Sequence, residues 1–151
     1  MKITELYEYI DRCVLNKFKF IQEFGYNHFI DYTKKYPNYN PDFRIVFENH
    51  AIDRIFEVSY FYKGEADNEI INNFSFTFWN EKGMDIINLK NYMLFIQKQE
   101  VYFYLDIFEG TFEEKLDQLL DYVVNVLQTY LMPVLKGEEW VDVPTNWYGA
   151  K

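Results

Sequence analysis

The feature that most limits the fold is a run in which apolar and polar side chains alternate. Within residues 69–79 (EIINNFSFTFW), the aromatic side chains of Phe74, Phe76 and Phe78 fall on every second position. The positions beside them are Asn73, Ser75, Thr77 and Trp79. Successive side chains of an extended chain point to opposite sides, so this alternation predicts a β-strand with one face in the core. The chain is therefore expected to build a sheet.

Further segments rich in aromatic and β-branched residues predict the other strands. Residues 43–49 and 52–63 precede the alternating run, and residues 100–109 (EVYFYLDIFE) alternate again. In the last segment, one face carries Val101, Phe103, Leu105 and Ile107. Residues 85–97 fit either a strand or a short helix. Consecutive strands joined by short turns favour an antiparallel meander of four to five strands.

Helical patterns lie at both ends of the chain. Apolar residues recur at helical spacing over residues 4–24, and a second, short helix is expected over residues 27–35, ahead of Pro37. Near the C-terminus, Thr111 and Glu114 form a capping box that predicts the start of a long helix. The apolar stripe of that helix is Leu116, Leu119, Leu120, Val123, Leu127, Tyr130 and Leu131. This order predicts an α+β fold with N-terminal and C-terminal helices packed on one face of the sheet.

The composition predicts a single domain over residues 1–151. Of the 151 residues, 49% are apolar, which is enough for a core without disulfide bridges. No internal repeat or Pro/Gly/Ser-rich linker divides the sequence. The single cysteine, Cys13, fits a reducing compartment. Neither a signal peptide nor a membrane-spanning apolar stretch is recognisable, and we expect a cytoplasmic protein.

Motifs that carry known chemistry are missing from the sequence. The two histidines, His28 and His50, and Cys13 do not form a metal-binding pattern. No nucleophile elbow or phosphate-binding glycine loop occurs, and Cys13 lies on the apolar stripe of the first helix. The acids Asp53 and Glu57 fit the solvent face of a sheet better than a catalytic pair. We therefore expect no catalytic residue, metal or cofactor, and an enzymatic role is not favoured.

The charge of the chain limits its partners. Twenty-four acidic and 15 basic residues give a net charge of −9. Nucleic acid and acidic membrane surfaces are repelled by such a chain, whereas a basic protein is attracted to it. The alternative interpretation is that this net charge only keeps a small protein soluble.

The sheet face opposite the helices is the predicted contact surface. It is expected to carry aromatic and acidic side chains, and Tyr and Trp are enriched at protein interfaces. The predicted contact residues are Trp79, Tyr102, Tyr104, Asp106 and Glu57. Two alternatives remain open: the C-terminal tail with Trp140 and Trp147 packs back over this face, or the face forms a homodimer.

In size, acidity, α+β order and the tail sequence LKGEEW at residues 135–140, the chain resembles the small immunity proteins of bacterial toxin systems. The resemblance implies a non-enzymatic bacterial protein that occludes the active site or substrate groove of a toxin. It assigns no residue to a site. Two other functions stay open: a small-molecule-binding protein or enzyme with an aromatic pocket between sheet and helices, and a structural homo-oligomer.

Overall fold

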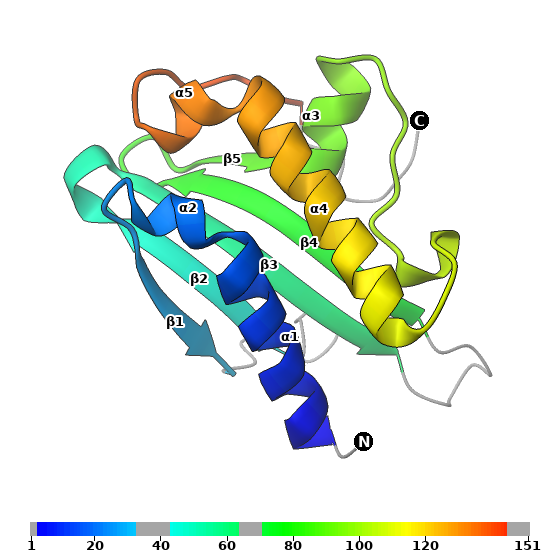
Figure 1. Ribbon diagram of the computed structural model, residues 1–151. Helices are drawn as coiled ribbons and strands as arrows, with labels where there is room; N and C mark the ends of the chain where they lie inside the picture. Colours follow the sequence, from blue (N-terminus) through cyan, green and yellow to red (C-terminus); the bar gives the residue numbers. More distant parts are fainter. Residues whose placement is uncertain (1–2, 33–42, 64–70, 145–151) are drawn as a thin grey trace.

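The computed structural model describes residues 3–32, 43–63 and 71–144. The described strands form a five-stranded sheet (Figure 1) and are β1 (Asn27–Asp31), β2 (Phe43–Asn49), β3 (Arg54–Lys63), β4 (Ile71–Asn80) and β5 (Asp85–Asn88). The described helices are α1 (Ile3–Lys17), α2 (Lys19–Gln22), α3 (Leu89–Phe95), α4 (Phe112–Tyr130) and α5 (Met132–Leu135). Short 3-10 helices lie in connections at His50–Ile52 and Leu105–Ile107.

The strands pair antiparallel in the order in which they occur along the chain. This confirms the predicted α+β fold with an antiparallel meander, and helices from both ends of the chain lie on one face of the sheet (Figure 1). The alternation predicted for β4 is confirmed, because Phe74, Phe76 and Phe78 are 2%, 1% and 0% exposed. Phe78 pairs with Phe56 of β3, and their ring centroids lie 4.8 Å apart.

The core lies between the sheet and a helix layer formed mainly by α1 and α4 (Figure 1). The ring centroid of Phe18, which follows α1, lies 5.6 Å from that of Phe56 and 6.4 Å from that of Phe76. Thr111 caps α4 as predicted, since its hydroxyl accepts a hydrogen bond from the Glu114 backbone N–H at 3.2 Å. The buried stripe of α4 includes Leu116, Leu119, Leu120, Val123 and Leu127. Helix and sheet therefore bury the faces that their periodicities predicted.

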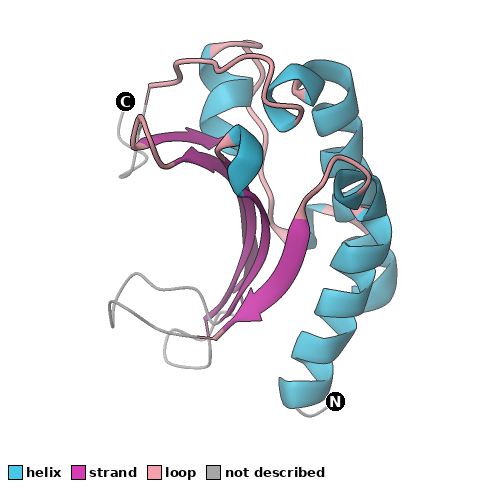
Figure 2. Cartoon of the chain, turned by 90° about the vertical axis from the view of Figure 1, so that its left-hand side faces the viewer, coloured by secondary structure: helices cyan, strands magenta, loops and turns pink. Residues whose placement is uncertain are grey.

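The two faces of the sheet differ in shape. The strands bend so that both ends of the sheet turn away from the helices (Figure 2). The face opposite the helices is therefore concave, and no helix in the described part of the chain covers it. We call this surface the concave face.

The prediction of a short helix over residues 27–35 is wrong for the residues that the structure describes. Residues 27–31 form strand β1, which pairs with β2 from Asn27 opposite Glu48 to Asp31 opposite Arg44. Backbone pairing with the edge of β2 outweighs the local helical pattern here. Residues 33–35 lie outside the described residues.

The strand expected over residues 100–109 is also wrong. Its first part is extended but bonds to β4 through the Phe74 N–H and the Phe103 carbonyl at 3.1 Å, and Leu105–Ile107 is a 3-10 helix. The reason lies in β5, which occupies the neighbouring position along β4 from Thr77 to Asn80. Phe103 and Leu105 are buried as expected, whereas Ile107 is 55% exposed.

Residues 85–97 contain both of the alternatives that the sequence left open. Strand β5 ends at Asn88, and α3 begins directly after it. The Asn88 side chain accepts hydrogen bonds from the backbone N–H groups of Lys90 and Asn91 and so caps the helix. One asparagine therefore separates the strand from the helix.

The C-terminal segment that follows α5 returns over the body of the protein. Trp140, Val141 and Val143 are partly buried and pack against the core. Trp147 lies outside the described residues. Trp140 therefore packs back on the body of the protein.

Candidate functional site

The concave face presents the side chains that alternate with the buried phenylalanines. Strand β4 contributes Ser75, Thr77 and Trp79. On β3, Glu57 is paired with Thr77 and Ile55 with Trp79, and directly paired residues share a face of the sheet. The predicted contact residues Trp79 and Glu57 therefore lie on the same face, on neighbouring strands.

A cluster of three charged side chains crosses β1, β2 and β3 on this face. Nη1 of Arg44 donates to Oε1 of Glu57 at 2.9 Å, and Nη2 of Arg44 donates to Oδ2 of Asp31. The side chains of Arg44, Asp31 and Glu57 are only 24%, 17% and 12% exposed. Withdrawal from water makes such pairs costly to break, because removing one member leaves a half-buried charge uncompensated.

Burial also governs the titration of this cluster. Burial raises the pKa of Glu57 above its ordinary value, and the opposing effects of Arg44 and Trp79 do not cancel the rise. Burial alone would lower the pKa of Arg44, but the bonds and charges of Asp31 and Glu57 raise it above its ordinary value. Arg44 thus pairs with one carboxylate from each of its two neighbouring strands.

Trp79 lies beside Glu57 on the concave face. The indole N–H is close enough to the carboxylate to lower the pKa of Glu57. Its geometry is not that of a hydrogen bond, however, and within the described part of the protein Nε1 is buried without a hydrogen-bond partner. An unpaired buried N–H costs free energy, and because this atom is closed to solvent, an acceptor on a bound molecule would remove that cost only after the side chains around the indole move.

Tyr102 and Tyr104 lie at the edge of β4, beyond the end of β5. Their rings are nearly parallel, with centroids 6.0 Å apart, and Nζ of Lys90 lies 5.3 Å from the centroid of Tyr102. Together with Ser75 and Asn88 they line a hollow of about 130 Å³. Since the side chain of Ser75 belongs to the concave face, the two tyrosines adjoin that face without being part of a strand.

Asp106 lies apart from the other predicted contact residues. It belongs to the 3-10 helix Leu105–Ile107, its side chain is 65% exposed, and its carboxylate lies 3.8 Å from Nζ of Lys115 on α4. The structure thus brings Trp79 and Glu57 together, places the tyrosines at the neighbouring edge and leaves Asp106 elsewhere.

Sequence reasoning missed Asp31 and Arg44 as members of the site. Asp31 fell in the segment expected to be helical, which hid its position on a strand. Arg44 carried a usable signal, because it alternates with the buried residues Phe43 and Ile45 of β2.

A second hollow lies at the upper end of the concave face, next to the turn from β4 to β5. Its volume is about 510 Å³, and Ile86 of β5, the cross-strand partner of Trp79, forms part of its lining. The rest of the lining is Met84, Asp85, Trp140, Asp142, Val143 and Pro144. This hollow is therefore continuous with the face that carries Trp79.

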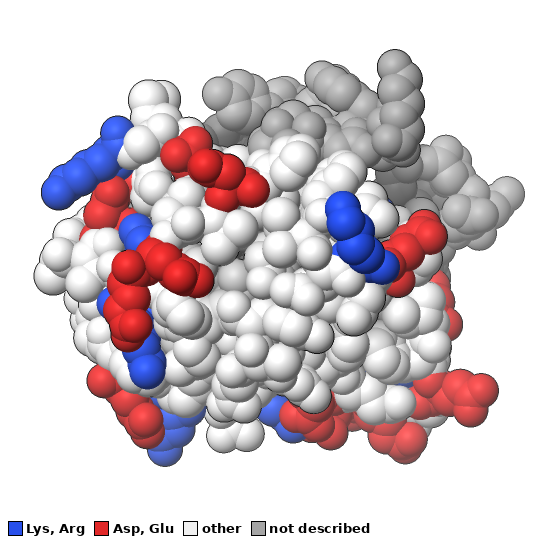
Figure 3. Space-filling view, turned by 90° about the horizontal axis from the view of Figure 1, so that it is seen from above, with Lys and Arg blue, Asp and Glu red and all other residues white. Residues whose placement is uncertain are grey.

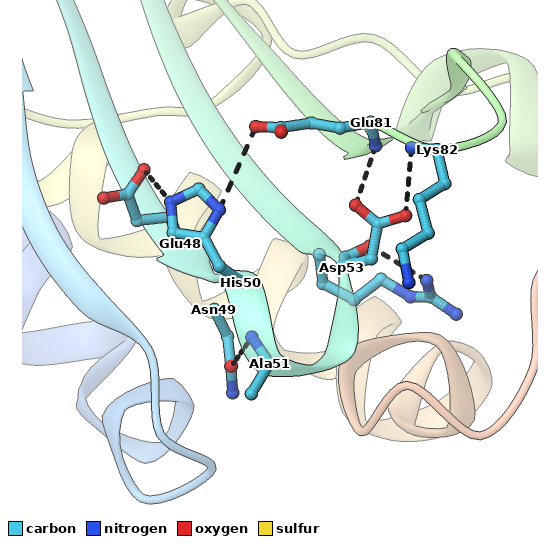
Figure 4. A network of polar contacts seen from close by, with 8 residues as sticks. Glu48, Asn49, His50, Ala51, Asp53, Glu81 and Lys82 are labelled. Atoms are coloured by element: carbon cyan, nitrogen blue, oxygen red, sulfur yellow. Dashed lines mark hydrogen bonds and ion pairs between the residues drawn. The ribbon is translucent and has the colours of Figure 1, made fainter.

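A polar network fixes the turns next to this hollow (Figure 4). The carboxylate of Asp53 accepts hydrogen bonds from the backbone N–H groups of Glu81 at 2.9 Å and Lys82 at 3.1 Å. His50 lies 3.2 Å from Glu48 and 4.0 Å from Glu81. The network joins the β2–β3 turn to the β4–β5 turn: Asp53 holds backbone groups, and Glu48 and Glu81 lie against the ring of His50.

Comparisons with family models, curated proteins and solved structures find no match to this chain. Among residues 3–32, 43–63 and 71–144, no group of three or more His, Cys, Asp or Glu side chains is placed to hold a metal ion. Over the same residues, no helix has both the length and the apolar character needed to cross a membrane.

Proposed function

We propose that this protein is a non-enzymatic binding module that receives another protein on the concave face of its sheet. The observation that carries this proposal is Trp79, which lies with an unpaired indole N–H beside the half-buried cluster of Asp31, Arg44 and Glu57. Tryptophan dominates the energetics of many interfaces, and paired charges that are already partly desolvated lose less on binding.

The net charge supports a basic protein as the partner. At −9, the chain attracts positively charged surfaces and speeds their approach. The concrete form of the proposal is a cytoplasmic bacterial immunity protein that covers the basic active site or substrate groove of a toxin. Nucleic acid and membranes are not the proposed partners.

The alternative of an aromatic pocket between sheet and helices has less support. The ring centroid of Phe18 lies within 6.4 Å of those of Phe47, Phe56 and Phe76, so aromatic side chains fill this part of the space between the layers. The concave face, by contrast, has no described helix over it (Figure 2).

Affinity capture from the protein's own source cells tests the proposal. We expect one stoichiometric partner that is released when the salt concentration is raised, since screening weakens charge attraction. Trp79→Phe keeps an aromatic ring but removes the indole N–H, and it should weaken capture. Ile107→Ala truncates an apolar side chain that is 55% exposed and lies outside the concave face, so capture should be unchanged.

Two outcomes would contradict the proposal. If the folded protein captures no partner, the proposal that it is a binding module is wrong. A partner retained equally by wild type, Trp79→Phe and Trp79→Ala would move the interface away from the concave face. A mass in solution that grows with protein concentration would instead favour a homo-oligomer.

A further inference from the structure

We propose that the hollow at the upper end of the concave face is an anchor point for an apolar side chain that the partner carries between basic residues. This inference rests on the proposed function and specifies the chemistry of the partner. Three properties of the hollow support it: an exposed methionine on a rigid turn, a preformed apolar wall and two carboxylates in the lining.

Met84 is held in the open by its own turn. It is 87% exposed, and its backbone adopts φ 52°, a left-handed conformation that is unfavourable for a residue with a long side chain. The Asn80 side chain accepts hydrogen bonds from the N–H groups of Gly83 at 3.0 Å and Asp85 at 3.3 Å. Met84 therefore combines two unfavourable features: its apolar side chain is exposed to water, and its backbone is strained.

Contacts from outside the turn add to this rigidity. Asp53 binds the backbone N–H groups of Glu81 and Lys82, so both halves of the turn are tied down (Figure 4). A backbone that is fixed before binding loses less conformational entropy when the partner arrives. Methionine is also enriched at protein interfaces, where its flexible thioether adapts to the partner.

The wall opposite Met84 is preformed. Trp140 lines the hollow, and the guanidinium of Arg54 lies 5.0 Å from the centroid of its ring. Ile86 and Val143 complete an apolar lining around a volume of about 510 Å³. This space accommodates a large aliphatic or aromatic side chain.

The charges around the hollow favour particular residues on either side of that side chain in the partner. Asp85 and Asp142 both belong to the lining. Basic residues on either side of an apolar anchor would pair with them, whereas a second copy of this chain would bring the same carboxylates and be repelled. Seen from above, the protein carries Lys, Arg, Asp and Glu mainly towards the margins of the view (Figure 3).

A defined peptide tests the inference without a known partner. The probe is a fluorescently labelled peptide of alternating lysine and leucine, compared with a Glu/Leu and a Lys/Ser version by anisotropy. We expect saturable binding of the Lys/Leu peptide alone. In a spectrum of ¹³C-labelled methionine methyl groups, the Met84 signal should shift, while that of Met93, which is 1% exposed, should not.

Variants separate specific docking from general attraction to an acidic protein. Asp85→Asn with Asp142→Asn should weaken binding roughly three- to tenfold, as expected for two exposed charges that each contribute modestly. The control Glu23→Gln with Glu113→Gln removes the same charge from exposed sites elsewhere and should leave affinity almost unchanged. Met84→Gly should weaken binding further, and it suits the left-handed backbone, so loss of folding is not expected.

Several results would overturn the inference. Equal binding of the Lys/Leu and Glu/Leu peptides, an unshifted Met84 signal, or unchanged affinity of Met84→Gly would each do so. A Met84 signal that moves with protein concentration in the absence of peptide would identify a second copy as the occupant.

The two proposals fail in different ways. If Trp79→Phe weakens partner capture but Met84→Gly changes neither capture nor peptide affinity, the anchor is wrong and the proposed function stands. If the peptide binds at Met84 while no protein is captured, the proposed function is wrong.

Discussion

Arg54 donates a hydrogen bond from Nε to the backbone carbonyl of Val134 at 2.9 Å and so ties β3 to α5. Its Nη2 donates to the carbonyl of Glu139 at 2.9 Å, and its guanidinium lies over the ring of Trp140. Arg54 is 8% exposed. A single buried side chain of the sheet therefore holds the C-terminal segment that forms one wall of the upper hollow.

Replacing Arg54 with methionine should destabilise the protein by about 2–4 kcal/mol, because the carbonyls of Val134 and Glu139, and those of Ile52 and Asp53 in its own turn, lose their donor while the aliphatic volume is kept. Urea unfolding measures the lost free energy of unfolding, and the fluorescence of Trp140 reports whether the C-terminal segment leaves the upper hollow. Arg12→Met is the control, since Arg12 is exposed, and it should change stability by less than about 0.5 kcal/mol. Equal effects of the two substitutions would show that the Arg54 contacts do not hold the segment.

Asp53→Asn should make stability less sensitive to acid. Hydrogen bonds from the backbone N–H groups of Glu81 and Lys82 lower the pKa of Asp53 below its ordinary value of 3.8. The folded protein therefore holds fewer protons than the unfolded chain, so this stabilisation is present above pH 3.8 and is lost as pH falls through the folded value. Urea midpoints of wild type and variant should differ at pH 7 and converge at low pH. A constant difference would contradict this role.

Glu57→Gln should show the opposite dependence. Burial raises the pKa of Glu57 above its ordinary value of 4.5, so its contribution to stability is full below that pH and is lost as pH rises through the folded value. The variant should be at least as stable as wild type at pH 7, and the difference should vanish below pH 4.5. Arg44→Met is the comparison, because it leaves two carboxylates without their cation and should destabilise the protein at pH 7.

Met84→Gly should leave stability unchanged or raise it by up to about 1 kcal/mol, because glycine adopts the left-handed backbone without strain. The matched control is Leu94→Gly in α3. Leu94 is 36% exposed in an ordinary helix, so its replacement should cost about 1 kcal/mol. Urea unfolding compares the two, and a similar loss in both would mean that Met84 is not strained.

Local patterns predicted the elements that dominate their own surroundings. The alternation of Phe74, Phe76 and Phe78 located β4 and its buried face, and Thr111 located the start of α4. Residues 27–31 and 100–109 were misassigned because their structure depends on which strand edges are free. That information lies in pairing between distant segments and not in either segment alone.

The candidate site was predicted only in part for the same reason. Trp79 and Glu57 belong to neighbouring strands, so their shared face followed from alternation. Tyr102 and Tyr104 were placed on a strand that does not form, yet they still lie near Ser75. The upper hollow had no local signal, because Trp140 reaches Ile86 only after the C-terminal segment folds back.

The consecutive order of the strands has a consequence for synthesis on the ribosome. Each strand pairs with the next one along the chain, so the pairing partners are close in sequence and can meet as they emerge. The helix layer depends on distant contacts: Lys17 with Asp121 spans 104 positions and Arg54 with Val134 spans 80. The phenylalanine face of the nascent sheet consequently waits for α4 before it is shielded from water. Apolar surface that is exposed during that interval favours aggregation.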